Sequence, residues 1–142
     1  MSAILIKLCY NYIRCRKKDF ILAKVFIKST LKNDDDIHMI ETKGILKNDL
    51  LIYNDDSLTV HVCLSSPIMI TRENDEYKII LKFDQNKIIT GNYLLKEINS
   101  YIPIEIKTNK LQRKDEHLKI NYELSIDGNW RKYELLIDYR RV

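Results

Sequence analysis

The sequence predicts an all-β protein, an antiparallel up-and-down barrel of about eight strands. Three observations favour this fold. Apolar and polar residues alternate in one segment after another, as they do in strands with one buried face. Turns rich in Asn and Asp separate these segments every dozen or so residues, and no stretch after residue 20 is suited to a helical crossover. Closing such a sheet removes its exposed edges, whereas a two-sheet sandwich is the alternative that the regular hairpin links disfavour.

An N-terminal extension, residues 1–20, differs from the rest of the chain. Its apolar residues recur at helical spacing and lead into a basic run at residues 14–18: Ile4, Leu5, Leu8, Tyr12 and Cys15. Three interpretations stay open. The segment is an appended helix or disordered tail, a basic amphipathic segment on an anionic membrane, or an arm that binds a partner or nucleic acid.

The barrel domain is predicted to span residues 21–142. Asn- and Asp-rich clusters at 33–36, 54–56 and 84–86 break it into short strands, because these side chains bond the local backbone. The strand-like segments, in order, are residues 21–32, 37–47, 50–53, 58–64, 67–72, 77–83, 87–96, 102–111, 118–126 and 133–139, and we expect them to form about eight strands.

The last two of these segments form the clearest hairpin. Apolar residues alternate with polar ones on both sides of Asp127, Gly128 and Asn129, and Gly adopts the positive φ that a tight turn requires. We expect the final strand to pair with the first strand near Val25, which closes the barrel.

Length and charge limit the function classes. The chain of 142 residues suits one domain, and its 24 basic and 20 acidic residues give a net charge of only +4. Nucleic-acid binding usually needs a concentrated basic face, and outside the N terminus the sequence shows no basic cluster. No apolar run is long enough to span a bilayer as a helix.

The three cysteines, Cys9, Cys15 and Cys63, indicate a reducing compartment. Their odd number and the lack of C-x-x-C spacing argue against a disulfide framework and against a zinc site. The residues after Ala3 do not have the order of a secretory signal, since basic residues follow the short apolar stretch. We therefore expect a cytoplasmic protein.

Several short motifs resemble those of the YwiB-like family of small bacterial proteins. They occur in the family's order over roughly residues 23–140: IETKG at 40–44, IMITREND at 68–75, LKF at 81–83, Tyr93, PIEIKTNKL at 103–111 and INYELSIDG at 120–128. The resemblance implies a lipocalin-like, calycin-type barrel. It implies no activity, because the family is a domain of unknown function.

Catalytic and metal-binding motifs are not apparent in the sequence. His38, His61 and His117 stand on separate segments without ligand spacing, and no nucleophile elbow, phosphate loop or H-E-x-x-H motif occurs. We therefore expect a protein that is not an enzyme and has no metal or cofactor, although catalytic groups can assemble from distant strands.

Arg72 is the most informative polar residue. It follows Ile68 and Ile70 on the face expected to point inward, where an unpaired charge is costly, so it needs an internal carboxylate or an anionic ligand. A rim arginine that reaches solvent or pairs with a nearby acid is the simpler alternative. Hydroxyl groups on the expected inner faces would line the same interior: Thr42, Tyr53, Tyr93, Thr108 and Tyr122.

Two functions follow as hypotheses. The first is non-catalytic binding, inside the barrel, of a small and partly apolar molecule, with an anionic group as the partner of Arg72. The second is binding of RNA or of a protein partner through the mildly basic outer surface.

Overall fold

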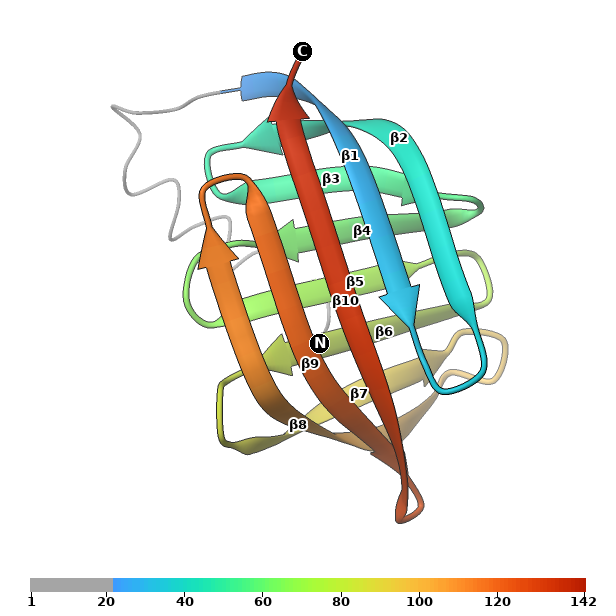
Figure 1. Cartoon of the computed structure of the whole chain (residues 1–142). Helices are drawn as coiled ribbons and strands as arrows, with labels where there is room; N and C mark the ends of the chain where they lie inside the picture. The colour runs from blue at the N-terminus through green and yellow to red at the C-terminus, as the bar shows by residue number, and fades with distance from the viewer. Residues whose placement is uncertain (1–21) are drawn as a thin grey trace.

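The computed structural model describes residues 22–142, which form one closed antiparallel barrel of ten strands (Figure 1). The predicted extension at residues 1–20 lies outside the described residues. The strands are β1 (Leu22–Lys32), β2 (Ile37–Lys47), β3 (Leu50–Asp55), β4 (Leu58–Cys63), β5 (Ile68–Glu73), β6 (Tyr77–Phe83), β7 (Ile88–Leu95), β8 (Ser100–Lys114), β9 (His117–Ile126) and β10 (Asn129–Arg141).

The order of the strands around the barrel follows the chain, so the predicted up-and-down meander is confirmed. β10 returns to β1 and pairs with it antiparallel, with Val25 opposite Arg141. The predicted closure near Val25 is therefore also confirmed. In Figure 1, β1, β2 and β8–β10 run steeply across the front of the molecule, while β3–β6 cross behind them.

The expected number of about eight strands is wrong, because every alternating segment forms a strand of its own. At six of the nine turns between these strands, the chain reverses through residues with positive φ: Asn48, Asp56, Asn86, Asn99, Asp115, Asp127 and Gly128. Asn and Asp tolerate this conformation better than other non-Gly residues. No two successive segments merge, and ten strands result.

The core fills the inside of the barrel with alternate residues from the strands. It includes Val25 and Ile27 of β1, Ile106 of β8 and Ile137 of β10, each at most 2% exposed. Gly44 allows β2 to approach β3 closely, because a Cβ there would lie 2.5 Å from the carbonyl oxygen of Ile52.

Pairing between β2 and β3 is partial. β2 pairs with β1 along its whole length, but it pairs with β3 only over residues 44–47. Residues 37–43 of β2 therefore diverge from β3. We call the unpaired stretch between β2 and β3 the seam. It lies at the end of the barrel where β2 begins and β3 ends, and we call this end of the barrel the Asp55 end. The opposite end, where β1 begins and β10 ends, is the C-terminal end.

A small apolar cluster lies on the outward face of β3, β4 and β5, where Leu50 and Cys63 pack with Ile52 and Met69.

Cys63 is disulfide-bonded, contrary to the expectation that the cysteines form no disulfide. Within residues 22–142 there is no helix with the length and apolar character needed to span a bilayer.

Candidate functional site

Arg72 lies on the inward face of β5, where the alternation of residues places it. Its register neighbours are Val60 of β4 and Ile79 of β6, which both pack in the core. The side chain is 19% exposed, so the guanidinium lies mostly inside the Asp55 end of the barrel. A charge in this position needs a partner of opposite charge.

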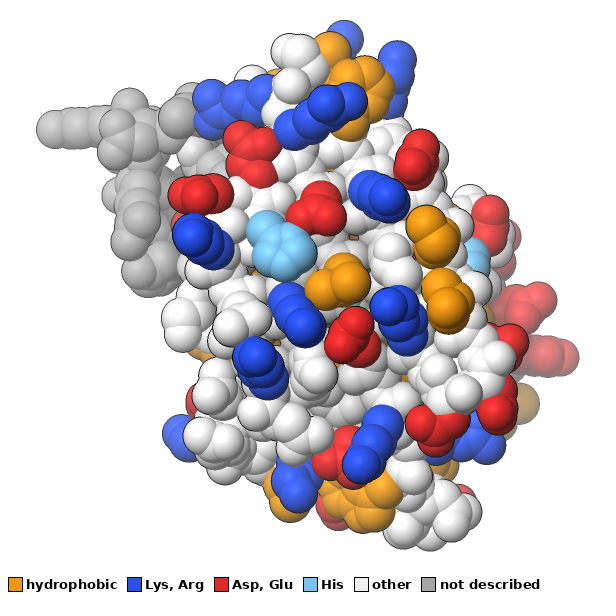
Figure 2. All heavy atoms as spheres, in the orientation of Figure 1, with side chains coloured by type: hydrophobic (Ala, Val, Ile, Leu, Met, Phe, Trp, Pro, Cys, Tyr) orange, Lys and Arg blue, Asp and Glu red, His pale blue; other side chains and the backbone are white. Residues whose placement is uncertain are grey.

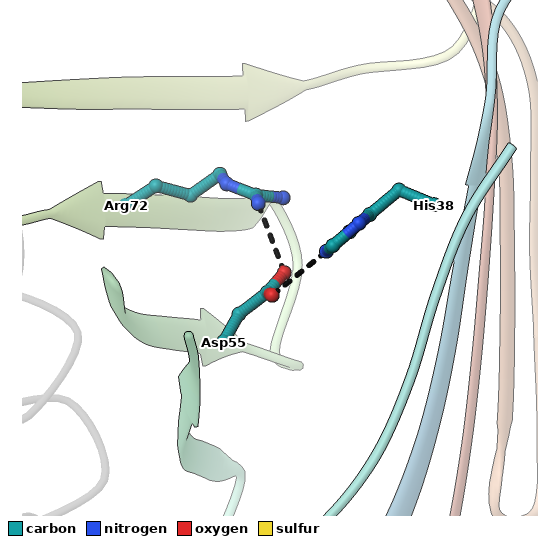
Figure 3. A network of polar contacts seen from close by, with 3 residues as sticks. All are labelled: His38, Asp55 and Arg72. Atoms are coloured by element: carbon teal, nitrogen blue, oxygen red, sulfur yellow. Dashed lines mark hydrogen bonds and ion pairs between the residues drawn. The ribbon is translucent and has the colours of Figure 1, made fainter. Parts of the chain in front are cut away.

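Asp55 is that partner. Its carboxylate is 4% exposed and accepts a hydrogen bond from Arg72 Nη2 at 3.1 Å (Figure 3). The other carboxylate oxygen lies 2.8 Å from His38 Nε2. His38 belongs to the part of β2 that does not pair with β3, so this contact joins the two strands across the seam. An internal carboxylate or an anionic ligand was expected beside Arg72, and the structure shows the internal carboxylate, that of Asp55.

The positive charge of Arg72 affects the pKa values of two buried tyrosines, Tyr53 and Tyr122. Burial raises the pKa of Tyr53, although a hydrogen bond with Ser29 and the Arg72 charge oppose this shift. Burial also raises the pKa of Tyr122, against the effect of Arg72. Both phenols therefore stay neutral at neutral pH and remain able to donate hydrogen bonds.

Aromatic rings line the interior around these residues. Tyr122 packs edge-on against Phe83, with ring centroids 4.9 Å apart, and stacks on Tyr133 at 5.3 Å. Tyr93 of β7 stacks on Tyr77 of β6 at 5.5 Å, and burial raises its pKa. The rings of Phe83 and Tyr122 belong to the packed core, and those of Tyr93 and Tyr133 lie against it.

The strand register brings most of the predicted residues together. Tyr53 and Tyr93 each lie two strands from Arg72, which corresponds to about 10 Å. Thr108 is directly opposite Tyr122. Thr42 is separate from this group, because it lies on the diverging part of β2 and its hydroxyl donates to the carbonyl of Lys43.

Among these residues, Thr108 has a buried side-chain hydroxyl that makes no hydrogen bond. It is 1% exposed, and its Oγ1 has no hydrogen-bond partner. A buried hydroxyl without a partner is costly.

A cation could bind at the Asp55 end, since ligand atoms of His38, Asp55 and Asp56 all lie within 4.8 Å of one another. The guanidinium of Arg72, bonded to the same carboxylate, works against a metal there. The other two histidines lie elsewhere: His117 contacts Asp138, and burial lowers the pKa of His61 on the outside of β4.

Sequence reasoning missed Asp55 and His38. The cluster Asn54, Asp55 and Asp56 is typical of a turn, whereas β3 continues to Asp55. The signal was present in the alternation, because Asp55 follows Leu51 and Tyr53 at two-residue spacing. His38 gave no comparable signal, since its contact depends on where β2 leaves β3.

Comparisons with known proteins support the fold. No protein-family model and no curated protein sequence matches the chain. The crystal structure of the YwiB protein from Bacillus subtilis superposes with a TM-score of 0.63 at 17% sequence identity, over 89% of this chain and 98% of that one. At this identity the match establishes the fold alone: the chain forms a β-barrel like that of YwiB, in agreement with the barrel that the motif resemblance implies.

Proposed function

We propose that this protein is a lipocalin-like, calycin-type barrel that binds a small, partly apolar anion without catalysing a reaction. The binding site is the Asp55 end of the interior. The single observation that carries this proposal is the inward guanidinium of Arg72, which has Asp55 as its one ionic partner among residues 22–142.

Arg72 has bonding capacity left for a ligand. A guanidinium carries several N–H donors in a planar fork that suits a carboxylate or phosphate, and the contact with Asp55 uses only Nη2. An anionic ligand would bind beside Asp55 or replace it. His38, which is 46% exposed, contacts the other oxygen of Asp55, whose side chain is 4% exposed.

The surroundings of Arg72 supply the rest of a small-molecule site. Tyr53 and Tyr122 offer neutral phenol groups, and Tyr93 offers an aromatic surface near the rim. The unpartnered Oγ1 of Thr108 supports the proposal independently of Arg72. A few polar groups set in apolar walls are typical of ligand sites.

Native mass spectrometry of gently purified full-length protein tests this proposal. We expect an additional mass of one small molecule, which is lost on denaturation. A complementary titration uses 1-anilinonaphthalene-8-sulfonate, a partly apolar anion, as a fluorescent probe. The variant Asp55→Leu/Arg72→Met removes the guanidinium together with its carboxylate, so no buried charge is left alone.

The matched control for the titration is Lys107→Met, which removes an exposed cation from the outer face of β8. We expect the double variant to bind the probe at least about tenfold more weakly, as for a lost charge-assisted hydrogen bond, and the control to match the wild type. A bare mass, together with equal probe binding by all three proteins, would show that the interior is only a core.

A further inference from the structure

A patch of basic and apolar side chains covers the outer face at the C-terminal end of the barrel. Figure 2 shows Lys and Arg side chains gathered there around apolar ones, with acidic side chains farther along the face. We call it the basic-apolar patch, and it consists of Leu22, Lys24, Phe26, Lys43, Ile45 and Arg140.

The strand register explains how these residues meet. Phe26 of β1 stands between Lys43 of β2 and Arg140 of β10, and Lys24 is opposite Ile45. Alternate residues of a strand share a face, so Leu22 joins them on the outside. The cations lie close to the aromatic ring, with Lys43 Nζ at 5.7 Å and Arg140 Cζ at 5.5 Å from its centroid.

The patch has a sharp boundary. In the next row along β1, Lys28 stands between Glu41 and Asp138, so acidic groups begin there. A groove of about 540 Å³ follows this boundary, with Phe26 and Arg140 on its basic side. An anionic partner would therefore approach the C-terminal end and leave the acidic row in water.

The apolar residues decide between two kinds of anionic partner. Leu22 is 63% exposed and Ile45 is 43% exposed, and neither side chain stacks on a base or bonds a phosphate. The ring of Phe26 already has a cation on either neighbouring strand, which leaves it less available for base stacking. Aliphatic and aromatic groups interspersed with Lys and Arg are instead the pattern of surfaces that adsorb to membranes.

We propose that the basic-apolar patch docks the barrel on an anionic phospholipid surface. Leu22, Phe26 and Ile45 enter the interfacial region. The cationic groups of Lys24, Lys43 and Arg140 bind the headgroup phosphates, and their aliphatic stems lie along the apolar side chains. This inference does not depend on the proposed interior site, which lies at the other end of the barrel.

Co-sedimentation of the full chain with vesicles tests the proposal. One set of vesicles contains phosphatidylglycerol and phosphatidylcholine, and the other contains phosphatidylcholine alone. We expect binding to the first set only, weakening as salt is raised. Lys43→Glu/Arg140→Glu should weaken binding at least about tenfold, because each cation near an anionic surface contributes to the affinity.

The matched control is Lys107→Glu/Lys132→Glu, which makes the same change in net charge on exposed positions of β8 and β10 outside the patch. We expect it to weaken binding less than about threefold. Leu22→Ser/Ile45→Ser keeps every charge and should also weaken binding, by about tenfold, through lost apolar burial. Thermal melts confirm that each variant folds.

Several outcomes would overturn the proposal. One is absence of binding to anionic vesicles at low salt, and another is equal loss in the patch and control variants. Unchanged binding after charge reversal in the patch would place the contact elsewhere in the chain. If the wild type instead binds single-stranded oligouridine in a patch-dependent manner and leaves the vesicles unbound, the patch is a nucleic-acid site.

Discussion

Replacing Asp55 with leucine tests whether the polar network at the Asp55 end is a coupled unit. The carboxylate is 4% exposed and holds both Arg72 and His38, at 3.1 Å and 2.8 Å. Asp55→Leu removes the ionic partner of a guanidinium that is only 19% exposed. The charge is then left mostly buried without compensation, which is the costly way to break an ion pair.

The magnitude follows from the exposure of the partners. Loss of one member of a fully buried pair costs about 3–5 kcal/mol, and the partial exposure of Arg72 moves the expected cost to about 3 kcal/mol. In a domain of this size that corresponds to a melting temperature about 10 °C lower. Arg72→Met leaves the carboxylate of Asp55 buried and should cost a similar amount.

The double variant Asp55→Leu/Arg72→Met separates the interaction energy between Asp55 and Arg72 from the independent effects of the two substitutions. With both charges gone and apolar groups in their place, we expect a stability within about 1 kcal/mol of the wild type. With single losses of about 3 kcal/mol each, the cycle then yields a coupling energy of about 5 kcal/mol. His38→Ala is the reference for a partly exposed partner, at 46% exposure, and should cost less than about 1 kcal/mol.

Urea unfolding followed by far-UV circular dichroism measures these quantities, provided that the slope with denaturant stays unchanged across the set. Additive losses in the double variant would refute the coupling. A cost below about 1 kcal/mol for Asp55→Leu would show that Arg72 reaches enough water to need no carboxylate.

Three further predictions concern the interior and the turns. Thr108→Val replaces a buried hydroxyl that has no partner with a methyl group, so the ligand-free protein should be up to about 1 kcal/mol more stable in urea unfolding; a destabilised variant would mean that the hydroxyl is bonded. Gly91→Ala should destabilise by about 1–3 kcal/mol, because its Cβ would lie 2.6 Å from the carbonyl oxygen of Ile80. Gly128→Ala has open space but a φ of 81°, so it should cost only about 1 kcal/mol, and melting temperatures in the reverse order would contradict this packing. Tyr53 and Tyr122 have raised pKa values in the fold, so the unfolded chain loses these protons at lower pH than the folded protein does. Their contribution to the free energy of unfolding should therefore be fully present below the unfolded pKa of 10.0 and decrease as the pH rises above it. Tyr53→Phe/Tyr122→Phe should flatten this alkaline loss, and an unchanged slope in urea unfolding between about pH 9 and 11 would assign the loss to other groups.

The fold was largely predictable because its signals are local. Two-residue alternation identified the strands, and the Asn and Asp turns separated them. Pairing of neighbours then required no long-range information, apart from closure between Val25 and Arg141. The number of strands was less predictable, because short segments such as β3 and β4 have room for only a few alternations.

The site was predictable only where it depends on alternation. That pattern placed Arg72 inside, together with Tyr53, Tyr122 and Thr108. The contact between Asp55 and His38 depends on how far β2 pairs with β3, which no local pattern encodes.

The basic-apolar patch was not predictable for a related reason. Lys43, Phe26 and Arg140 come from three strands, and they form one row only in the observed register. The net charge of the whole chain averages this patch with the acidic residues around it.

The pairing of the first strand with the last has a consequence for synthesis and folding. Residues from opposite ends of the chain must meet before the barrel closes, so many of its contacts are far apart in sequence and folding should be slow. Until β10 leaves the ribosome, β1 and β9 each keep an open edge that can pair with another chain. A chain truncated before Asn129 lacks β10, so the barrel cannot close and the edges of β1 and β9 stay exposed. We therefore expect the truncated chain to aggregate.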